Sequence, residues 1–351
     1  MSCRRSSPPA RQRGVALVVA LLVFALCAIL MVGMQSEFNL FHQRVANHLL
    51  AEQGDAYLRG AEQLAALALQ ADHDADQLRG GEPRDDLGEI WARDATPYPL
   101  EEGGWLLGGL EDLQGRFNLN WLVPAAPPES GEPRPPAERL TPAQRVFVRL
   151  LQSLGEASLS LDEALALTLA IGDWLDDNAL PLTAGSEDDA YLGRTPAYRA
   201  ANRPMASASE LRAVTGMNPA LFQALLPVVT VWPQDGAAST LNIHTAPLPV
   251  LRALGGGERL APLSEAEGQA LLSRQREEGG FASLEDFLAS PVFENLSGGD
   301  RETLEALLGE ASDWFLLSAE VEVAERRLRL YSVLHRDQRS VRAVTRAYGS
   351  P

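Results

Sequence analysis

The residues in this chain that could do chemistry are six carboxylates gathered in one short acidic stretch. No Lys or Arg lies among them. Carboxylates held this close repel one another unless a hard cation lies between them, and Ca²⁺ accepts six to eight oxygen ligands in irregular geometry. The six residues are Asp173, Asp176, Asp177, Glu187, Asp188 and Asp189.

The spacing within this stretch is compatible with a metal site but does not require one. Asp173 lies three or four residues before Asp176 and Asp177, so these carboxylates share one face at a helix end. The spacing differs from that of an EF-hand loop. A solvated acidic loop explains the same residues, so a calcium site and a solvated loop both remain open at this point.

Enzymatic chemistry has little support in the sequence. A glycosidase would need two of the carboxylates in a sugar-sized cleft with aromatic platforms. The five histidines are scattered without paired metal-ligand spacing, and there is no phosphate loop, dinucleotide fingerprint or nucleophile elbow. We therefore predict that the chain is not an enzyme.

Charge and cysteine content exclude further classes of protein. The chain has 351 residues and a net charge of −17, and a polyanion repels nucleic acid. Cys3 lies near the N-terminus and Cys27 lies in an apolar segment, and there are no other cysteines. The rest of the chain therefore has no disulfide and no thiolate-bound metal.

The apolar segment is Val15 to Met34, which carries no charged side chain. As a helix these twenty residues span about 30 Å, the thickness of the hydrocarbon core of a bilayer. The preceding leader contains four arginines and no acid, so we expect it to remain in the cytoplasm and the rest to cross the membrane. A cleaved signal peptide and a plain unprocessed anchor are the alternatives.

The junction of leader and apolar segment is Gly14-Val15. A basic leader ending in Gly directly before an apolar run resembles the class III leader of type IV pilins and type II secretion pseudopilins. A prepilin peptidase cuts such leaders after the Gly, so the resemblance predicts a mature chain that begins at Val15.

Helical periodicity continues past the apolar segment. Apolar residues from Phe38 to Leu64 recur at helical spacing, which predicts one helix from Val15 to about Leu69. Two helices broken near Gly33 or Gly54 are the alternative. The second half would be amphipathic and would need a partner surface, most simply a sheet of the same chain.

The rest of the chain divides into strands and a helical block. We predict short strands at 105–107 and 116–120 around a turn at 109–115, and then a proline-rich boundary at 124–142. Helices then follow, several with Ser-started capping signals. They are expected at 142–154, 161–175, 207–214, 219–226, 247–254, 264–277, 283–289 and 300–308.

Period-2 alternation in the last forty residues predicts antiparallel strands at 318–323, 327–334 and 340–348. The fold class is therefore α+β: a long N-terminal transmembrane and amphipathic helix packed on an antiparallel sheet, which a large all-α insertion interrupts.

The stretch LNIHTAPLPVLRAL and the helix after it look like a helix-hairpin-helix unit of DNA-binding competence proteins. The hairpin region, residues 255–259, is irregular and contains an acid. With a strongly acidic chain, a helical bundle used for protein contacts is the better interpretation, and a membrane-anchored DNA-binding uptake protein remains the alternative function.

Several runs together resemble general secretion pathway protein K, the large minor pseudopilin family of type II secretion. They are RG-VALVVALLV, DLQGRFNLN, GDWLDDN, GSEDDAYL, PAYRAANRPMASASELRAVTG, LNIHTA and the closing strands. The resemblance implies a leader at 1–14, a transmembrane segment at 15–34, pseudopilin helix and strands at 35–123, a helical insertion at 124–310 and completing strands at 311–351.

The resemblance also implies function and ligands. It implies calcium held by the acidic residues, with Asp173, Asp176, Glu187 and Asp188 as the best candidates and Asp177 beside them. It implies a single-pass inner-membrane protein, mostly periplasmic, that works with prepilin peptidase, the major pseudopilin and other minor pseudopilins, and with no nucleic acid.

The fifth residue counted from Val15 is Val19, where most pilins carry Glu. This chain therefore cannot neutralise the N-terminal amine of a neighbouring subunit within the membrane. Together with the bulky insertion, this fits a single copy at the tip of the pseudopilus, the position that the family resemblance implies, where it would initiate or cap assembly.

Overall fold

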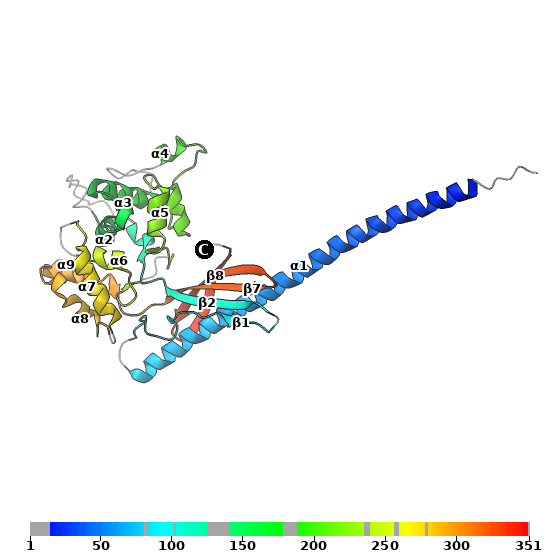
Figure 1. The fold of residues 1–351 in the computed structure, drawn as a ribbon. Coiled ribbons are helices and arrows are strands. Elements are labelled where there is room, and N and C mark those ends of the chain that lie inside the picture. The colour runs from blue at the N-terminus through cyan, green and yellow to red at the C-terminus, as the bar shows by residue number, and fades with distance from the viewer. Residues whose placement is uncertain are drawn as a thin grey trace, which may run out of the picture.

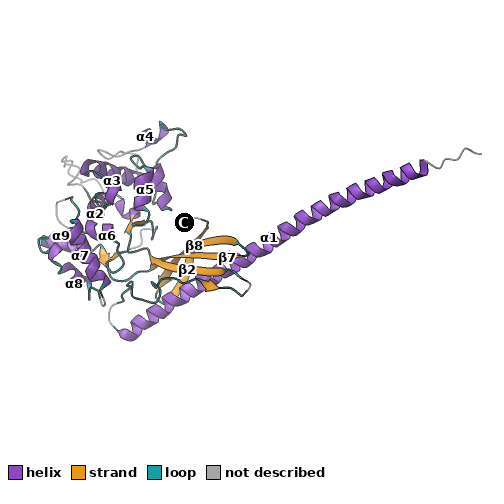
Figure 2. Cartoon of the chain, in the orientation of Figure 1, coloured by secondary structure: helices purple, strands orange, loops and turns teal. Residues whose placement is uncertain are grey.

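The computed structural model describes residues 15–80, 83–101, 103–124, 140–177, 188–234, 239–255, 260–277 and 280–349. The described chain consists of one long helix, a five-stranded antiparallel sheet on the second half of that helix, and a helical module inserted between two strands of the sheet (Figure 1, Figure 2).

Helix α1 (Val15–Arg79) is continuous over 65 residues. Its first half is exposed throughout and is apolar and long enough to span a membrane. The helix runs past the predicted end near Leu69, because no proline occurs between Val15 and Pro83, and it ends where Gly80 adopts a φ of +69°. The predicted single helix is therefore confirmed, without a break at Gly33 or Gly54.

The sheet has the strand order β1 (Tyr98–Pro99), β2 (Trp105–Asp112), β7 (Trp314–Val323), β8 (Arg326–Asp337) and β9 (Ser340–Tyr348). Burial alternates strictly along β7, and its buried side packs on α1. Both late turns use two-residue loops with residues at positive φ, as tight hairpins require. The three predicted closing strands are therefore present.

The predicted turn at 109–115 is wrong in its first half. Gly108 and Gly109 lie inside β2, which pairs with β7 from Trp105 opposite Glu322 to Asp112 opposite Phe315. This continuous pairing holds the two glycines extended, which local turn propensity alone does not foresee.

The chain leaves the sheet after Asp112. Gly115 lies so close to the backbone of Thr245 that a Cβ there would come within 2.9 Å of its carbonyl carbon and oxygen. β3 (Phe117–Asn118) consequently pairs in parallel with β4 (Val229–Thr230) in the helical module, and not with the five-stranded sheet.

The helical module contains short helices and two small parallel strand pairs. The predicted helices lie within three residues of those observed, and the one predicted at 207–214 is a 3-10 helix. Its other elements are η1 (Leu119–Leu122), α2 (Pro142–Leu151), η3 (Gly155–Ala157), α3 (Leu161–Leu175), α4 (Asp188–Leu192), η4 (Ala208–Ala213), α5 (Pro219–Leu225), β5 (Leu241–Asn242), α6 (Leu248–Ala253), α7 (Glu265–Arg276), α8 (Leu284–Leu288), η5 (Pro291–Phe293), α9 (Gly298–Glu305) and β6 (Leu308–Gly309).

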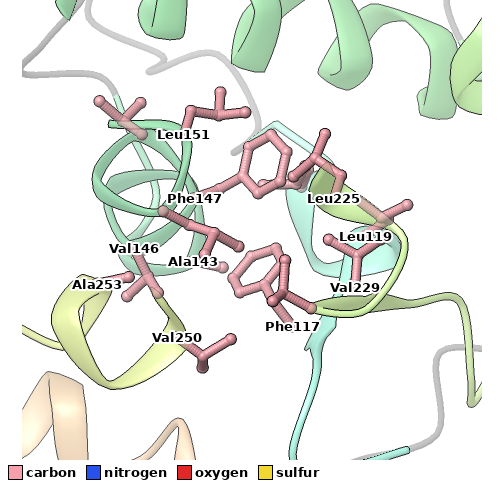
Figure 3. Packing of buried hydrophobic residues seen from close by; sticks show 14 of the residues in the cluster. Phe117, Leu119, Ala143, Val146, Phe147, Leu151, Leu225, Val229, Val250 and Ala253 are labelled. Carbon is pink, nitrogen blue, oxygen red and sulfur yellow. The ribbon is translucent and has the colours of Figure 1, made fainter. Parts of the chain in front are cut away.

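The helical module has its own hydrophobic core, separate from the cluster between α1 and the sheet. Phe117 and Phe147 pack with ring centroids 5.3 Å apart at its centre, with Leu119 and Val229 beside them (Figure 3). Of the capping boxes expected at Ser207, Ser264 and Ser283, the first two are complete, whereas at the third the Asp286 side chain accepts from the Ala282 amide. A module with its own core and capped helices can hold its shape independently of the sheet.

Candidate functional site

The first candidate site is the side of α1 that faces away from the sheet. The residues of α1 that pack on the sheet recur at helical spacing from Gly54 to Asp72. On the opposite side runs an apolar stripe, of which Leu64, Leu67 and Leu78 are 63%, 58% and 89% exposed. The stripe comprises Ala56, Gly60, Leu64, Leu67, Ala71 and Leu78.

Three features make the apolar stripe suitable for helix packing. A Cβ placed on Gly60 would meet nothing of this chain within 4 Å, so another helix could approach closely there. By helical periodicity the stripe continues Phe38, Val45 and Leu49, all exposed, toward the membrane half. An apolar helix face of this length, left uncovered by the chain itself, is suited to packing against helices of other subunits.

The second candidate site is a buried junction where the sheet meets the helical module. Arg336 of β8 contacts both oxygens of Asp85 at 2.6 Å, Asp72 of α1 at 3.0 Å and the carbonyl oxygen of Ser312 at 2.7 Å. Asp72, Asp85 and Arg336 are all buried. Burial raises the pKa of Asp72 to about 6 and that of Asp85 to about 7, while the guanidinium opposes the rise.

Asp112, at the end of β2, is the third buried carboxylate of the junction. It accepts hydrogen bonds from the Gln114 amide, the Ser312 hydroxyl, the Thr245 hydroxyl and the Asn242 side chain at 2.5–3.1 Å. Burial raises the pKa of Asp112, and these donors oppose the rise. Since the donors come from the sheet and from the helical module, Asp112 fixes one to the other.

Two sequence runs that were singled out in the sequence analysis hold this junction together. Asn242, His244 and Thr245 belong to LNIHTA, and the Asn242 side chain also donates to the Asp85 carbonyl oxygen at 2.9 Å. His244 is buried 3.5 Å from Glu310, and burial lowers its pKa. Spacing gave no signal for this role, because the partners lie 66 to 157 residues apart in the chain.

The run DLQGRFNLN connects the sheet to the module in the same way. The Gln114 side chain accepts from the Asp313 amide at 2.6 Å and donates to the Thr240 carbonyl at 3.0 Å. The Asn120 side chain donates to the carbonyls of Met205 and Val231 at 3.2 and 2.9 Å. These side chains satisfy backbone groups of distant loops, which fixes where the module is held.

The third candidate site is the predicted calcium stretch. Asp173 in the last turn of α3 is fully buried, and Asp176, which caps the C-terminus of α3, is 8% exposed. Asp177 is exposed, and Glu187 lies outside the described residues. Asp188 begins α4, where it accepts from the Ala200 amide at 3.1 Å and lies 3.4 Å from the Arg199 guanidinium.

The donor set at this helix end suits a hard cation. Two carboxylates buried at the C-terminus of α3 face the negative end of the helix dipole, which disfavours their charge. All the candidate ligand atoms are oxygens, as Ca²⁺ prefers. The donor chemistry therefore suits a calcium ion, although the described acids of this stretch do not bring three carboxylates within 4.8 Å of one another. The leader with Gly14 lies outside the described residues, and Val15 begins α1.

A second acidic cluster lies at the C-terminal end of α1. Carboxylate oxygens of Asp72, Asp76 and Glu89 lie within 4.8 Å of one another. An arginine contacts each of the three, since Arg336 binds Asp72 and Arg79 binds both Asp76 and Glu89. Burial raises the pKa of Glu89 to about 7. The contacts with Arg79 and Arg336 therefore account for the close approach of these carboxylates.

The long apolar helix with an antiparallel sheet on its second half is the architecture of a pseudopilin. A chain of the crystal structure of the GspK-GspI-GspJ complex from the enterotoxigenic Escherichia coli type 2 secretion system has the same fold. The TM-score is 0.71 at 26% identity, over 88% of this chain and 100% of that chain.

The type II secretion system protein K family models match residues 115–234 and 241–308. Type II secretion system protein K of Pectobacterium carotovorum subsp. carotovorum is 33% identical, and that of Klebsiella pneumoniae is 32% identical, each over 97% of both chains. The Pseudomonas aeruginosa protein is 34% identical over 93% of this chain and 89% of its own.

This chain therefore belongs to the type II secretion system protein K family, and it is a minor pseudopilin of that system. The predicted family and fold class are confirmed.

Proposed function

We propose that this minor pseudopilin occupies the tip of the pseudopilus, where it initiates or caps assembly for protein export across the outer membrane. The observation that carries the proposal is the position of the helical module, at the end of the molecule away from the exposed half of α1 (Figure 1). With that half in the inner membrane and the rest in the periplasm, the module would block the place of a subunit stacked above it.

The tip position can be tested by labelling. A peptide tag is inserted at residues 125–139, in the helical module between η1 and α2, and gold-labelled antibody locates it on isolated pseudopili. The proposal expects one label at one end of each filament. Labels spaced along the filament would contradict it.

The partners that the architecture favours are the major pseudopilin and other minor pseudopilins. Their α1-type helices would pack on the apolar stripe. The complex in which the structural relative was crystallised contains three Gsp proteins, which supports partners of this class. Val19 at mature position five cannot neutralise the N-terminal amine of a neighbouring subunit, whereas a partner's carboxylate would still neutralise the amine of this chain in the membrane.

The proposal includes processing by prepilin peptidase between Gly14 and Val15. The intact mass and N-terminal sequence of the protein from membranes, with active and with inactive peptidase, test this step. A chain that begins at Val15 only with active peptidase is expected. A Met1 start in both, or a cut after Met34, would contradict it.

Calcium is the ligand we propose for the acidic stretch, held by Asp173 and Asp176 with Asp177, Glu187 and Asp188 as further ligands. A cation at a hundred times its dissociation constant would stabilise the folded chain by about 2.7 kcal/mol. We therefore expect Ca²⁺ to raise the thermal unfolding midpoint and a chelator to reverse the effect.

The matched variants for the calcium test are Asp173→Asn and Asp189→Asn, which remove equal charge from the same acidic run. Asp173→Asn should abolish the calcium-dependent rise, and Asp189→Asn, outside the proposed ligand set, should keep it. Equal unfolding midpoints of the unmodified chain with Ca²⁺ and with chelator would contradict the site.

A further inference from the structure

The two edges of the five-stranded sheet differ in length and chemistry. β1 forms one edge with two residues, and the second is Pro99, which has no backbone N–H. β9 forms the other edge with nine residues and no proline. Since β9 pairs with β8 on one side, its other side presents backbone N–H and C=O groups that no described strand pairs with.

The β9 edge is basic in a chain whose net charge is −17. Arg339, Arg342 and Arg346 lie within ten residues that contain no acid. Arg346 binds Glu62 of α1 through two contacts of 2.8 Å, and Arg339 lies 3.0 Å from Asp74. Arg342 is exposed and forms no ion pair with any residue that the structure describes.

Charged side chains often protect an edge strand from pairing, but this explanation covers only part of the β9 edge. Two of the three arginines are drawn back onto α1 and do not stand over the open edge. Val344, which is 42% exposed, follows Arg342 by two residues where the β8–β9 register is irregular, and Tyr348 near the end of the strand donates its hydroxyl to Asp55 of α1. What remains is a long, open and partly apolar edge with one available guanidinium.

Charge selects the kind of strand that this edge can accept. If two copies paired through β9 in antiparallel fashion about Arg342, the two Arg342 side chains would lie opposite each other. Like charges directly opposite each other destabilise strand pairs, so a second copy is disfavoured. A strand with an acidic side chain across from Arg342 would be stabilised instead.

We propose that the β9 edge accepts an extended acidic segment of another protein chain as a sixth strand of the sheet. Backbone hydrogen bonds along β9 would supply affinity, and Arg342 would select for the acid. This inference concerns a different surface from the apolar stripe and does not depend on the tip position.

The test uses the full chain in lipid nanodiscs and a fluorescent nine-residue peptide in which valine alternates with glutamate and threonine. We expect saturable binding by anisotropy. N-methylation of alternate peptide amides keeps the charge but blocks strand pairing, so it should weaken binding at least about tenfold. Lysine in place of glutamate should weaken it to a similar degree, about tenfold.

The variant Arg342→Glu should also weaken binding of the glutamate peptide about tenfold and partly restore binding of the lysine peptide. The matched control is Arg203→Glu, an equal charge reversal at an exposed residue of the helical module. Absence of saturable binding, equal binding of the N-methylated peptide, or equal loss in both variants would each overturn the proposal.

Discussion

Arg336 holds two buried carboxylates, Asp72 and Asp85, where the sheet meets the helical module. Removing one partner from a buried ion pair leaves uncompensated charge and costs about 3–5 kcal/mol. We therefore expect Arg336→Met to lower the unfolding free energy at pH 7 by an amount in this range, measured by denaturant titration. The loss should shrink at pH 5, where the carboxylates take up protons.

The control for this prediction is Arg339→Met, which removes an exposed partner of Asp74 three residues further along the chain. Exposed ion pairs contribute about 0–1 kcal/mol, so this variant should remain near the unmodified protein. Equal losses in the two variants, or a loss in Arg336→Met that does not change with pH, would contradict the assignment of the junction.

The raised pKa values at the junction predict a pH dependence. Asp72 at about 6 and Asp85 at about 7 lie above their ordinary 3.8, so the folded chain binds more protons than the unfolded chain between about pH 4 and 7. Their contribution to the unfolding free energy should therefore fall as the pH rises through this window. Denaturant titrations at pH 5 and pH 8 measure the change.

Asp85→Asn removes one titrating group and should make the unfolding free energy less dependent on pH between pH 5 and 8. The exposed Asp74→Asn serves as the control and should retain the full slope. An unchanged slope in Asp85→Asn would show that Asp85 is ionised throughout this range.

At the residue scale, the sequence indicated which runs mattered but not what they do. LNIHTA and DLQGRFNLN were singled out by resemblance, yet their side chains act across the junction on partners far away in the chain. Local spacing carries no information about such partners. The acidic stretch, by contrast, was visible from composition because its members are neighbours in sequence.

At the scale of elements, α1 uses two opposite sides for two purposes. One side packs on the sheet, and the other presents the apolar stripe. Leu67→Glu places a charge in the stripe at a position that is 58% exposed. The unfolding free energy should change by no more than about 0.5 kcal/mol, whereas co-purification with other minor pseudopilins should be lost.

The matched control is Gln77→Glu, which adds the same charge at an exposed position of α1 that is turned about 80° away from Leu67 around the helix. It should leave both stability and co-purification unchanged. If Leu67→Glu still co-purifies with its partners, the apolar stripe is not the assembly surface.

Element type was predictable wherever periodicity was strong. The alternation of β7 and the capping boxes at Ser207 and Ser264 place these elements correctly. The strand predicted at 116–120 is present only as β3, since η1 begins at Leu119, and neither the pairing of β3 nor the extended glycines of β2 were predictable in the same way. The conformation of β3 and of these glycines depends on pairing with β4 and β7, which lie more than a hundred residues away.

At the scale of the whole molecule, the helical module is an insertion whose two ends meet. Asp112 at the end of β2 pairs with Phe315 near the start of β7, and the Leu113 amide donates to the Trp314 carbonyl at 2.9 Å. The chain between Asp112 and Phe315 leaves the sheet after β2 and returns to it beside the point where it left. The pseudopilin part and the part proposed to block the filament are thus joined at a single place, through the junction.

This arrangement allows a direct test of the capping role. Replacing residues 114–313 by Asn-Gly would join β2 to β7 through a two-residue hairpin turn, which suits antiparallel neighbours. The cluster of α1 against the sheet lies outside the deleted segment, so this shortened chain should fold. Asp112 would lose its Asn242, Thr245 and Ser312 donors but would gain contact with water.

The shortened chain still carries the apolar stripe, so it should join its partners but no longer block the next subunit. In cells that produce the major pseudopilin, filaments should grow longer with the shortened chain than with the intact chain, as measured on electron micrographs. Circular dichroism and co-purification with partners establish first that the shortened chain folds and assembles. If it does both and filament lengths stay the same, the helical module does not cap the pseudopilus.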